Sequence, residues 1–359
     1  MTEKKQKKWF FTTLLTTISV LLVIFLAMVI VDPYFHFHGP VKGISYRLYS
    51  ERYMNSGIAR HFDYDAVITG SSMNQNFKTT QMDELFGTNT IKIPFSGAGF
   101  EEIKDHIEIA LNSENDVKYV LWGIDYNGLN RDADWKRYDE YPEYLYDKNP
   151  FNDVFYIYNK TILFEGLVNT FLYNLSGKET TTFDEYSSWE AGSGWESISK
   201  TYRREKDIMP MEDITEEEIL RVKNNITENI VNLANAYPET EFLLFYTPYS
   251  ALYWEDLYRR GMLEKQLEME AIATELMLEC ENIKLFSFAG ETNITGDINQ
   301  YRDKEHYIAP INELILEWIS SGHGLLTKEN YQELIQWEKE YYQNYDYDSL
   351  YVGYEEYMH

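Results

Sequence analysis

The chain has 359 residues, a formal net charge of -27 and one cysteine, Cys280. So acidic a protein repels phosphate, and we therefore expect no nucleic-acid partner. The single cysteine excludes an intrachain disulfide framework and a metal site built from several cysteines. We expect Cys280 to be a small core residue. The length is sufficient for one large domain or two small ones after any membrane segment.

The first predicted element is a transmembrane helix. Residues 9–31 contain no charged side chain, and a run of 23 residues is long enough to span a bilayer. Residues 1–8 carry four lysines, which by the positive-inside rule places them in the cytoplasm and the remainder of the chain outside the cell membrane. A cleavable signal peptide is the alternative. It is disfavoured because its apolar region would be shorter and no small-residue cleavage site follows.

Residues 32–64 form a polar and aromatic connector. It contains His36 and His38, whose spacing could supply two metal ligands, but no third ligand is nearby in the sequence. We therefore interpret this stretch as a juxtamembrane segment, and we expect neither a metal nor a cofactor.

An alternating pattern of strands and helices begins at residue 65. Short β-favouring apolar runs alternate with amphipathic segments, which predicts a parallel sheet in an α/β domain over residues 65–326. The predicted strands are 66–69, 90–93, 117–122, 242–246 and 283–288, and the predicted helices are 79–86, 100–111, 215–236, 261–281 and 310–320.

Two segments depart from this pattern. Residues 130–213 are rich in tyrosine, serine, glycine and acids, and we interpret them as an insertion that shapes a cleft or docks a partner, or as a loose surface loop. Residues 327–359 are acidic and tyrosine-rich. We expect them to pack against the domain through their tyrosines, although a glycan-stacking platform is conceivable.

The first strand ends in small polar residues that suit a nucleophile. Gly70, Ser71 and Ser72 follow it directly, where a short side chain would lie at the carboxyl edge of the sheet near backbone N–H groups. We predict that Ser72 is the nucleophile. A serine that caps the next helix is the alternative interpretation.

A serine nucleophile needs a base and a group that orients the base. Six of the seven histidines lie near the membrane, before the first strand, inside a helix or beyond the last helix. His306 follows the last strand at the same sheet edge, and Asp303 precedes it by three residues, close enough to hold its imidazole. A polar loop whose histidine caps the next helix is the alternative.

The third requirement is an oxyanion hole. The Ser72 backbone N–H is one expected donor, and Gly97 or Gly99 after the second strand is another. A side-chain donor is expected after the third strand, where the sequence has Asp125 and then Asn127.

This order of blocks resembles the SGNH/GDSL hydrolase superfamily. The matching blocks are Gly70-Ser71-Ser72, Gly97, Gly123-Ile124-Asp125-Tyr126 and Asp303-Lys304-Glu305-His306. The resemblance implies a flavodoxin-like three-layer fold around a parallel sheet. The chain departs from the family pattern in two places: Ser71 replaces an aspartate, and Asp125 replaces the asparagine that donates to the oxyanion. An ionised carboxylate cannot donate, so Asn127 or Asn74 would have to substitute.

Together with the N-terminal anchor, the chain resembles membrane-anchored SGNH-like proteins that work beside membrane-bound O-acyltransferases. The resemblance implies an extracytoplasmic serine esterase or O-acyltransferase that acts on envelope polysaccharide or polyol phosphate. The alternative is a catalytically weak accessory protein that binds a glycan and docks such an acyltransferase.

Overall fold

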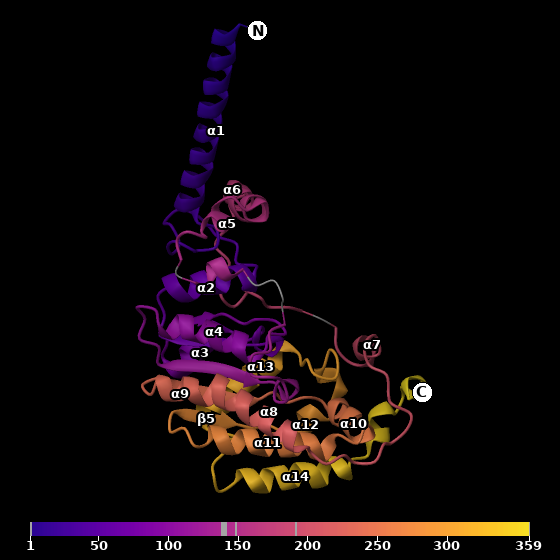
Figure 1. Ribbon diagram of the computed structural model, residues 1–359. Coiled ribbons are helices and arrows are strands. Elements are labelled where there is room, and N and C mark those ends of the chain that lie inside the picture. The colour runs from indigo at the N-terminus through magenta and orange to yellow at the C-terminus, as the bar shows by residue number, and fades with distance from the viewer. Residues whose placement is uncertain (1, 138–141, 148, 191, 359) are drawn as a thin grey trace. The chain divides into compact units, whose positions relative to one another are not determined.

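The regular strands form one parallel sheet, as predicted. Figure 1 shows the computed structural model, which describes residues 2–137, 142–147, 149–190 and 192–358. Five strands lie in the order β2-β1-β3-β4-β5, and every neighbouring pair is parallel. Their bounds are β1 Ala66–Gly70, β2 Thr90–Lys92, β3 Tyr119–Ile124, β4 Glu241–Tyr246 and β5 Ile283–Phe286.

The strands are buried almost throughout, which explains why they read as continuous apolar runs. All five residues of β1 are buried, and Val67 pairs with Ile91 on one side and Val120 on the other. Burial on both faces is usual for a parallel sheet and favours unbroken runs over alternation. Because all strands point the same way, the loops that leave their carboxyl ends collect at one edge.

The polypeptide divides into two units. The first comprises Met1–Phe62 and Glu140–Thr182, and the second, which contains the sheet, comprises Asp63–Asp139 and Phe183–His359. The predicted insertion at 130–213 therefore contributes residues to both units. The helical elements of the first unit are α1 Glu3–Val31, α2 Glu51–His61, η3 Glu143–Leu145, α5 Val154–Ile157, the π-helix η4 Ile162–Val168 and α6 Asn169–Leu175.

The helices of the second unit follow the predicted alternation. Those between β1 and β4 are η1 Ser72–Asn74, α3 Thr79–Phe86, α4 Phe100–Leu111, η2 Tyr126–Gly128, α7 Trp195–Ile198, α8 Glu216–Ile226, the π-helix η5 Thr227–Val231 and α9 Asn232–Ala236. Those after β4 are α10 Ala251–Arg259, α11 Leu263–Met277, α12 Thr292–Thr295, η6 Ile298–Gln300, α13 Ala309–Ser321, α14 Tyr331–Gln343, η7 Tyr347–Tyr351 and η8 Glu355–Tyr357.

Helices α2 and α10 were not expected from the sequence. Residues 251–257 of α10 are all buried, including the acids Glu255 and Asp256, which form ion pairs with Arg204 and Lys304. Helix α2 contains Gly57, whose Cα lies against the backbone carbonyls of Tyr34 and Phe35, where a Cβ would collide.

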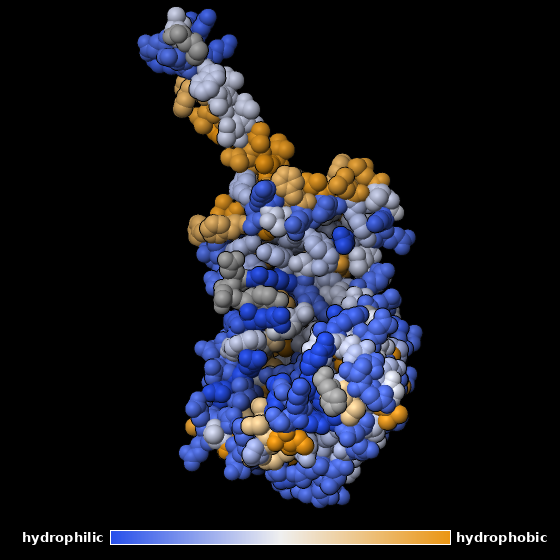
Figure 2. All heavy atoms as spheres, turned by 90° about the vertical axis from the view of Figure 1, so that its right-hand side faces the viewer, coloured by the Kyte–Doolittle hydropathy of each residue, from blue (hydrophilic) through white to orange (hydrophobic). Residues whose placement is uncertain are grey.

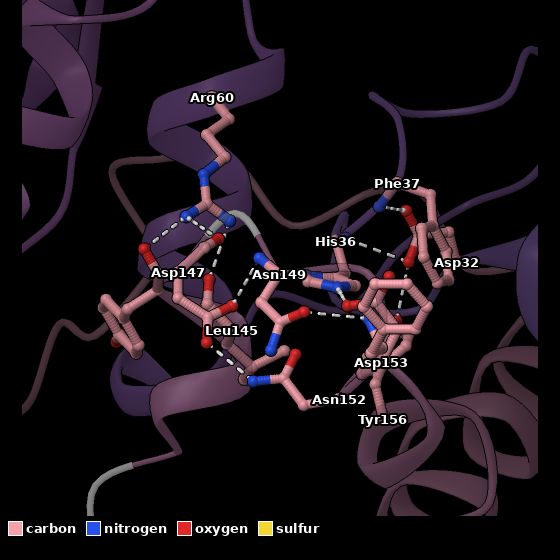
Figure 3. A network of polar contacts seen from close by, with 12 residues as sticks. Asp32, His36, Phe37, Arg60, Leu145, Asp147, Asn149, Asn152, Asp153 and Tyr156 are labelled. Carbon is pink, nitrogen blue, oxygen red and sulfur yellow. Dashed lines mark hydrogen bonds and ion pairs between the residues drawn. The ribbon is translucent and has the colours of Figure 1, made fainter.

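The first unit begins with a helix suited to a membrane. Helix α1 reaches a mean hydropathy of 3.0 over 18 residues, so it is long and apolar enough to cross a bilayer. Directly after it, the buried Asp32 carboxylate accepts hydrogen bonds from the backbone N–H groups of His36, Phe37 and His38 and from the Tyr156 hydroxyl (Figure 3). This carboxylate ties the end of α1 to α5.

The two histidines of the connector have structural partners in the first unit. His36 Nε2 lies 2.9 Å from Asp153 Oδ1 (Figure 3). The ring nitrogens of His38 lie 2.7 Å from the Gly39 carbonyl oxygen and 2.8 Å from the Val29 carbonyl oxygen. These contacts fix the turn that follows α1.

The C-terminal segment packs against the second unit through its aromatic residues. The Tyr342 ring of α14 stacks on Trp254 of α10 at a centroid distance of 4.5 Å, and the Tyr351 hydroxyl donates to Glu255 at 2.7 Å. The segment also buries a second acid, Glu338, beside Glu270 of α11. Cys280 is buried, as expected.

The Glu270–Glu338 pair retains protons in the folded protein. Burial raises the pKa of Glu270 to about 8, and burial together with the nearby Glu270 raises the pKa of Glu338 well above its ordinary value. In the unfolded chain these glutamates release their protons above the ordinary glutamate pKa of 4.5. The contribution of the pair to stability is therefore full at acid pH and is lost as the pH rises towards about 8.

We predict that Glu338→Gln makes the stability of the protein depend less on pH. Between about pH 5 and about pH 8 the thermal midpoint of the detergent-solubilised wild type should fall more steeply than that of the variant, because the amide has no proton to lose. Glu333→Gln, an exposed position on the same helix, should behave as wild type. Parallel curves for Glu338→Gln and wild type would contradict the assignment.

Candidate active site

The turn after β1 is held rigidly and presents Ser72 at the carboxyl edge of the sheet. Gly70 has a φ of 131°, and the Asn74 side chain lies against its Cα, so only glycine fits there. The Ser71 hydroxyl accepts a hydrogen bond from the Met73 N–H at 3.3 Å. The Gly123 N–H of β3 donates to Asn74 Oδ1 at 3.3 Å. This bond ties the turn that carries Ser72 to the neighbouring strand.

His306 lies in the loop between η6 and α13 and reaches back to this turn. An isolated bridge pairs Tyr301 with Tyr307, and the Arg302 N–H donates to the His306 carbonyl at 2.8 Å. His306 Nε2 lies 2.8 Å from Ser72 Oγ. A compact loop thus brings a histidine side chain to the end of β1.

Asp303 holds the imidazole from the other side. Its Oδ2 and Oδ1 lie 2.9 and 3.1 Å from His306 Nδ1, and its Oδ1 also accepts the backbone N–H groups of Glu305 and His306. Since an ionised carboxylate only accepts, Nδ1 carries the proton and Nε2 is left to accept from the Ser72 hydroxyl. This is the hydrogen-bond pattern of a serine–histidine–aspartate triad.

The charges around His306 favour its protonated form. Burial lowers the pKa of the imidazole, but the hydrogen bond and charge of Asp303, together with the charges of Glu305 and Asp125, raise it above the ordinary value. Burial alone would raise the pKa of Asp303, yet its bonds to His306 hold that pKa below the ordinary value. The imidazolium formed when His306 takes a proton is therefore stabilised by the site.

Ser72 and His306 open into a pocket of about 230 Å³. Two arginines and a tryptophan line this pocket, together with residues from the turns after β2 and β3: Arg131, Arg137, Trp135, Gly97 and Asn127. The Arg131 guanidinium stacks over the Trp135 ring at 4.6 Å from its centroid. The lining thus includes two arginines beside two acids, Asp125 and Glu305.

Ser72 and Gly97 carry the backbone N–H groups that were expected to form an oxyanion hole. Ser72 and Gly97 both line the pocket, and neither N–H donates to another described residue. Gly97 has a φ of 68°, and a guanidinium nitrogen of Arg137 lies against its Cα. Glu102 of α4 holds this arrangement, because its Oε2 accepts the N–H groups of both Gly99 and Arg137 at 2.9 Å.

Asn74 and Asn127 are the two side chains that were expected to donate a hydrogen bond to the oxyanion, and they lie in different surroundings. Asn74 is fully buried and does not line the pocket, so its amide cannot reach a substrate there. Asn127 lines the pocket, but its side chain hydrogen-bonds Glu305 and its Oδ1 accepts from Tyr253 at 3.4 Å. Neither amide is therefore positioned as a ready donor.

Asp125 lies in the same pocket as an acceptor. The Tyr249 hydroxyl donates to its Oδ1 at 2.9 Å. Burial raises the pKa of Asp125, while hydrogen bonds from Ser71, Tyr249 and Thr247 and the charge of His306 partly offset that rise. The charge of Asp125 raises the pKa of His306. Its side chain has no N–H group that could donate to an oxyanion.

Several site residues were not predicted from the sequence. The Trp189 ring packs edge-on to His306 at a centroid distance of 5.9 Å, and the backbone N–H of Trp189 donates to Asn76 Oδ1 at 2.8 Å. Glu305 could have been suspected because it adjoins His306. Trp189, Trp135 and Arg137 come from the irregular segment after β3, and no local pattern marks them.

A metal-binding arrangement is not found in the part of the chain that the structure describes: no group of three or more histidine, cysteine, aspartate or glutamate side chains is placed to hold an ion.

Comparisons with known proteins yield little. No protein-family model and no curated protein matches the chain. The similar solved structures include a Streptococcus pneumonia protein provisionally described as a platelet activating factor. It is 12% identical, with a TM-score of 0.39 over 76% of this chain and 90% of that one. A likeness at this level carries no functional argument.

We predict that the pKa of His306 lies above the ordinary 6.5 and falls in Asp125→Asn, because the variant removes one of the charges that raise it. NMR titration of the imidazole in ¹³C-histidine-labelled protein measures both values. Asp134→Asn, an exposed position outside the pocket, is the control and should leave the pKa unchanged. An unchanged or higher pKa in Asp125→Asn would contradict the electrostatic account.

Proposed function

We propose that the chain is a membrane-anchored SGNH-type serine esterase or O-acyltransferase that acts on acylated cell-envelope polysaccharide. The observation that carries this proposal is the hydrogen-bond relay from Ser72 through His306 to Asp303. Ser72 and His306 line a pocket, and the backbone N–H groups of Ser72 and Gly97 at this pocket donate no hydrogen bond to another described residue. The strand order β2-β1-β3-β4-β5 supports the flavodoxin-like arrangement that the family resemblance implies.

The relay provides each step of acyl transfer. Ser72 Oγ attacks the ester carbonyl while His306 Nε2 takes its proton, and the Ser72 and Gly97 N–H groups hold the resulting oxyanion. The tetrahedral intermediate then collapses, and His306 returns the proton to the departing alcohol. Water or a sugar or polyol hydroxyl attacks the acyl-serine next, its proton passing to His306, and Ser72 is released with an acid or a new ester as product.

The membrane helix supports an envelope location. With the lysine-rich residues 1–8 in the cytoplasm, the catalytic unit works outside the cell membrane. A membrane-bound O-acyltransferase is the proposed partner, and the acceptor is a polysaccharide or a polyol phosphate. The arginine-lined pocket is compatible with an anionic acceptor.

The nucleophile is tested with a fluorophosphonate probe on the detergent-solubilised full-length protein. Wild type should be labelled and Ser72→Ala should not, while Ser320→Ala on the surface of α13 should be labelled as wild type. The labelling rate should fall as the pH drops through the raised pKa of His306, because the protonated imidazole cannot accept the serine proton. A folded wild type that takes no label would overturn the proposal.

Arg137 supplies positive charge where the family pattern loses its asparagine. Asp303, Glu305 and Asp125 surround His306 with negative charge, which would repel a developing oxyanion, whereas the Arg137 guanidinium lies against Gly97. We predict that Arg137→Met slows labelling by about tenfold to a hundredfold, which is less than the loss of about a hundredfold to a thousandfold on removal of a direct oxyanion donor.

The matched control for Arg137 is its neighbour Lys136. That ammonium pairs with Glu101 and Asp105 on α4 and does not line the pocket, so Lys136→Met should leave the labelling rate unchanged. Equal effects of the two substitutions would show that Arg137 acts only through the general charge of the surface, and would contradict its assigned role.

The accessory-protein alternative rests on Asp125, whose carboxylate occupies the place of a donor. A protein of that kind would leave envelope acylation unchanged in Ser72→Ala and His306→Ala cells. Loss of acylation in both variants, with normal protein levels, would exclude it.

A further inference from the structure

Residues 151–175 of the first unit, here called the apolar segment, expose large hydrophobic side chains. The segment comprises α5, η4 and α6, and its side chains exposed by at least half include Phe151, Phe155, Phe164, Phe171, Leu172 and Leu175. Phe151 is 90% exposed and Leu175 is 69% exposed. An apolar surface of this size needs a partner or a membrane to cover it.

The composition of the apolar segment sets it apart from the rest of the chain. Charged residues make up 25% of the protein, but residues 151–175 contain only three, Asp153, Lys160 and Glu165. Tyr49 donates to the Glu165 carbonyl at 2.9 Å, and the neighbouring Gly166 packs against the Pro33 ring, just beyond α1. Glu165 thus lies level with the end of the membrane helix, where water is close.

Contacts with α1 place the segment at membrane depth. The Tyr158 hydroxyl donates to the Leu21 carbonyl at 3.3 Å, and both α5 and η4 touch α1. Leu21 and Val31 are ten residues apart, or about 15 Å along a helix, which is about half the thickness of the hydrocarbon core. Helices α5 and η4 therefore lie beside the C-terminal half of the only described helix apolar enough to span a bilayer, and α6 continues from η4 and is tied to the connector by hydrogen bonds between Asn174 and Ser45.

The attachment between the segment and α1 is firm. Tyr156 donates to the buried Asp32 carboxylate at 2.6 Å, and Asp153 pairs with His36 at 2.9 Å (Figure 3). Figure 2 shows the result, with hydrophobic side chains gathered around the base of α1 within the first unit. If α1 is in a bilayer, these side chains enter it as well.

The backbone of the segment is suited to a lipid environment. Helical turns pair their own N–H and carbonyl groups, which is the requirement inside hydrocarbon. At the start of η4, Asn159 Oδ1 accepts the Thr161 N–H at 2.9 Å and the Ile162 N–H at 3.3 Å. The exposed Lys160 has a side chain long enough to reach the interface.

We propose that residues 151–175 insert beside α1 into the half of the bilayer nearest its C-terminal end, with the exposed aromatic and aliphatic side chains against lipid acyl chains. The protein then has a membrane footprint wider than one helix. The second contact restrains the rotation and tilt of α1, because the Asp32 network couples the two elements.

Single labels in full-length protein test this insertion. Cys280 is the only cysteine and is buried, so a Cys280→Ser background accepts one new cysteine at a chosen site. An environment-sensitive fluorophore is placed at Phe171→Cys and, separately, at Phe164→Cys. The protein is reconstituted in phosphatidylcholine vesicles with and without lipids brominated on the acyl chain.

Two further sites provide the controls. A label at Leu15→Cys in α1 shows the emission and quenching expected in lipid. A label at Val352→Cys shows those expected in water, because Val352 is 74% exposed in the second unit. We expect the labels at Phe164 and Phe171 to emit at shorter wavelength and to be quenched several times more than the label at Val352.

Quenching at Leu15 but not at either segment position would overturn the proposal and would indicate that a protein partner covers the surface instead. Absence of quenching at Leu15 as well would overturn the membrane placement of α1 and the proposal with it. Neither result bears on Ser72 reactivity, so the insertion and the proposed function fail separately.

Discussion

The hydrogen bond between Ser72 Oγ and His306 Nε2 is the interaction on which the functional account depends. It joins two loops 234 residues apart in the sequence, at a distance of 2.8 Å. The parallel sheet makes this possible, because it directs the end of β1 and the end of β5 to one edge although two strands, β3 and β4, lie between them in the sheet. Asp303 then orients the ring through a bond of 2.9 Å, so one short loop supplies both the base and its positioning group.

Electrostatics distinguishes this site from a simple triad. Three carboxylates raise the affinity of His306 for a proton, which favours proton abstraction but would also repel a developing oxyanion. The Arg137 guanidinium beside Gly97 counters that repulsion, and Glu102 couples the two loops that carry them. The site thus sets three carboxylates, of which Asp303 acts most strongly on His306, against the arginines that line the pocket.

The sequence predicted the elements with strong local signals. Helices α3 and α4 begin and end at the predicted residues, and each strand lies within two residues of its predicted start, because apolar runs and glycine punctuation mark them. The sequence also led to the juxtaposition of Ser72, Asp303 and His306, which the structure brings into hydrogen-bond contact; their catalytic role stays a prediction. Helix α10 was not predicted, although its apolar residues recur at helical spacing. Trp189 and Arg137 approach the site through long-range packing that no local pattern encodes.

The central claim is that Ser72 carries the acyl group during turnover. The most direct measurement is peptide mass spectrometry of the full-length protein, quenched in acid after brief exposure to an activated acetyl ester. The account predicts one added acetyl group on the peptide that contains Ser72, in wild type and not in Ser72→Ala or His306→Ala. An unmodified Ser72 in folded protein, or equal acetylation in His306→Ala, would contradict it.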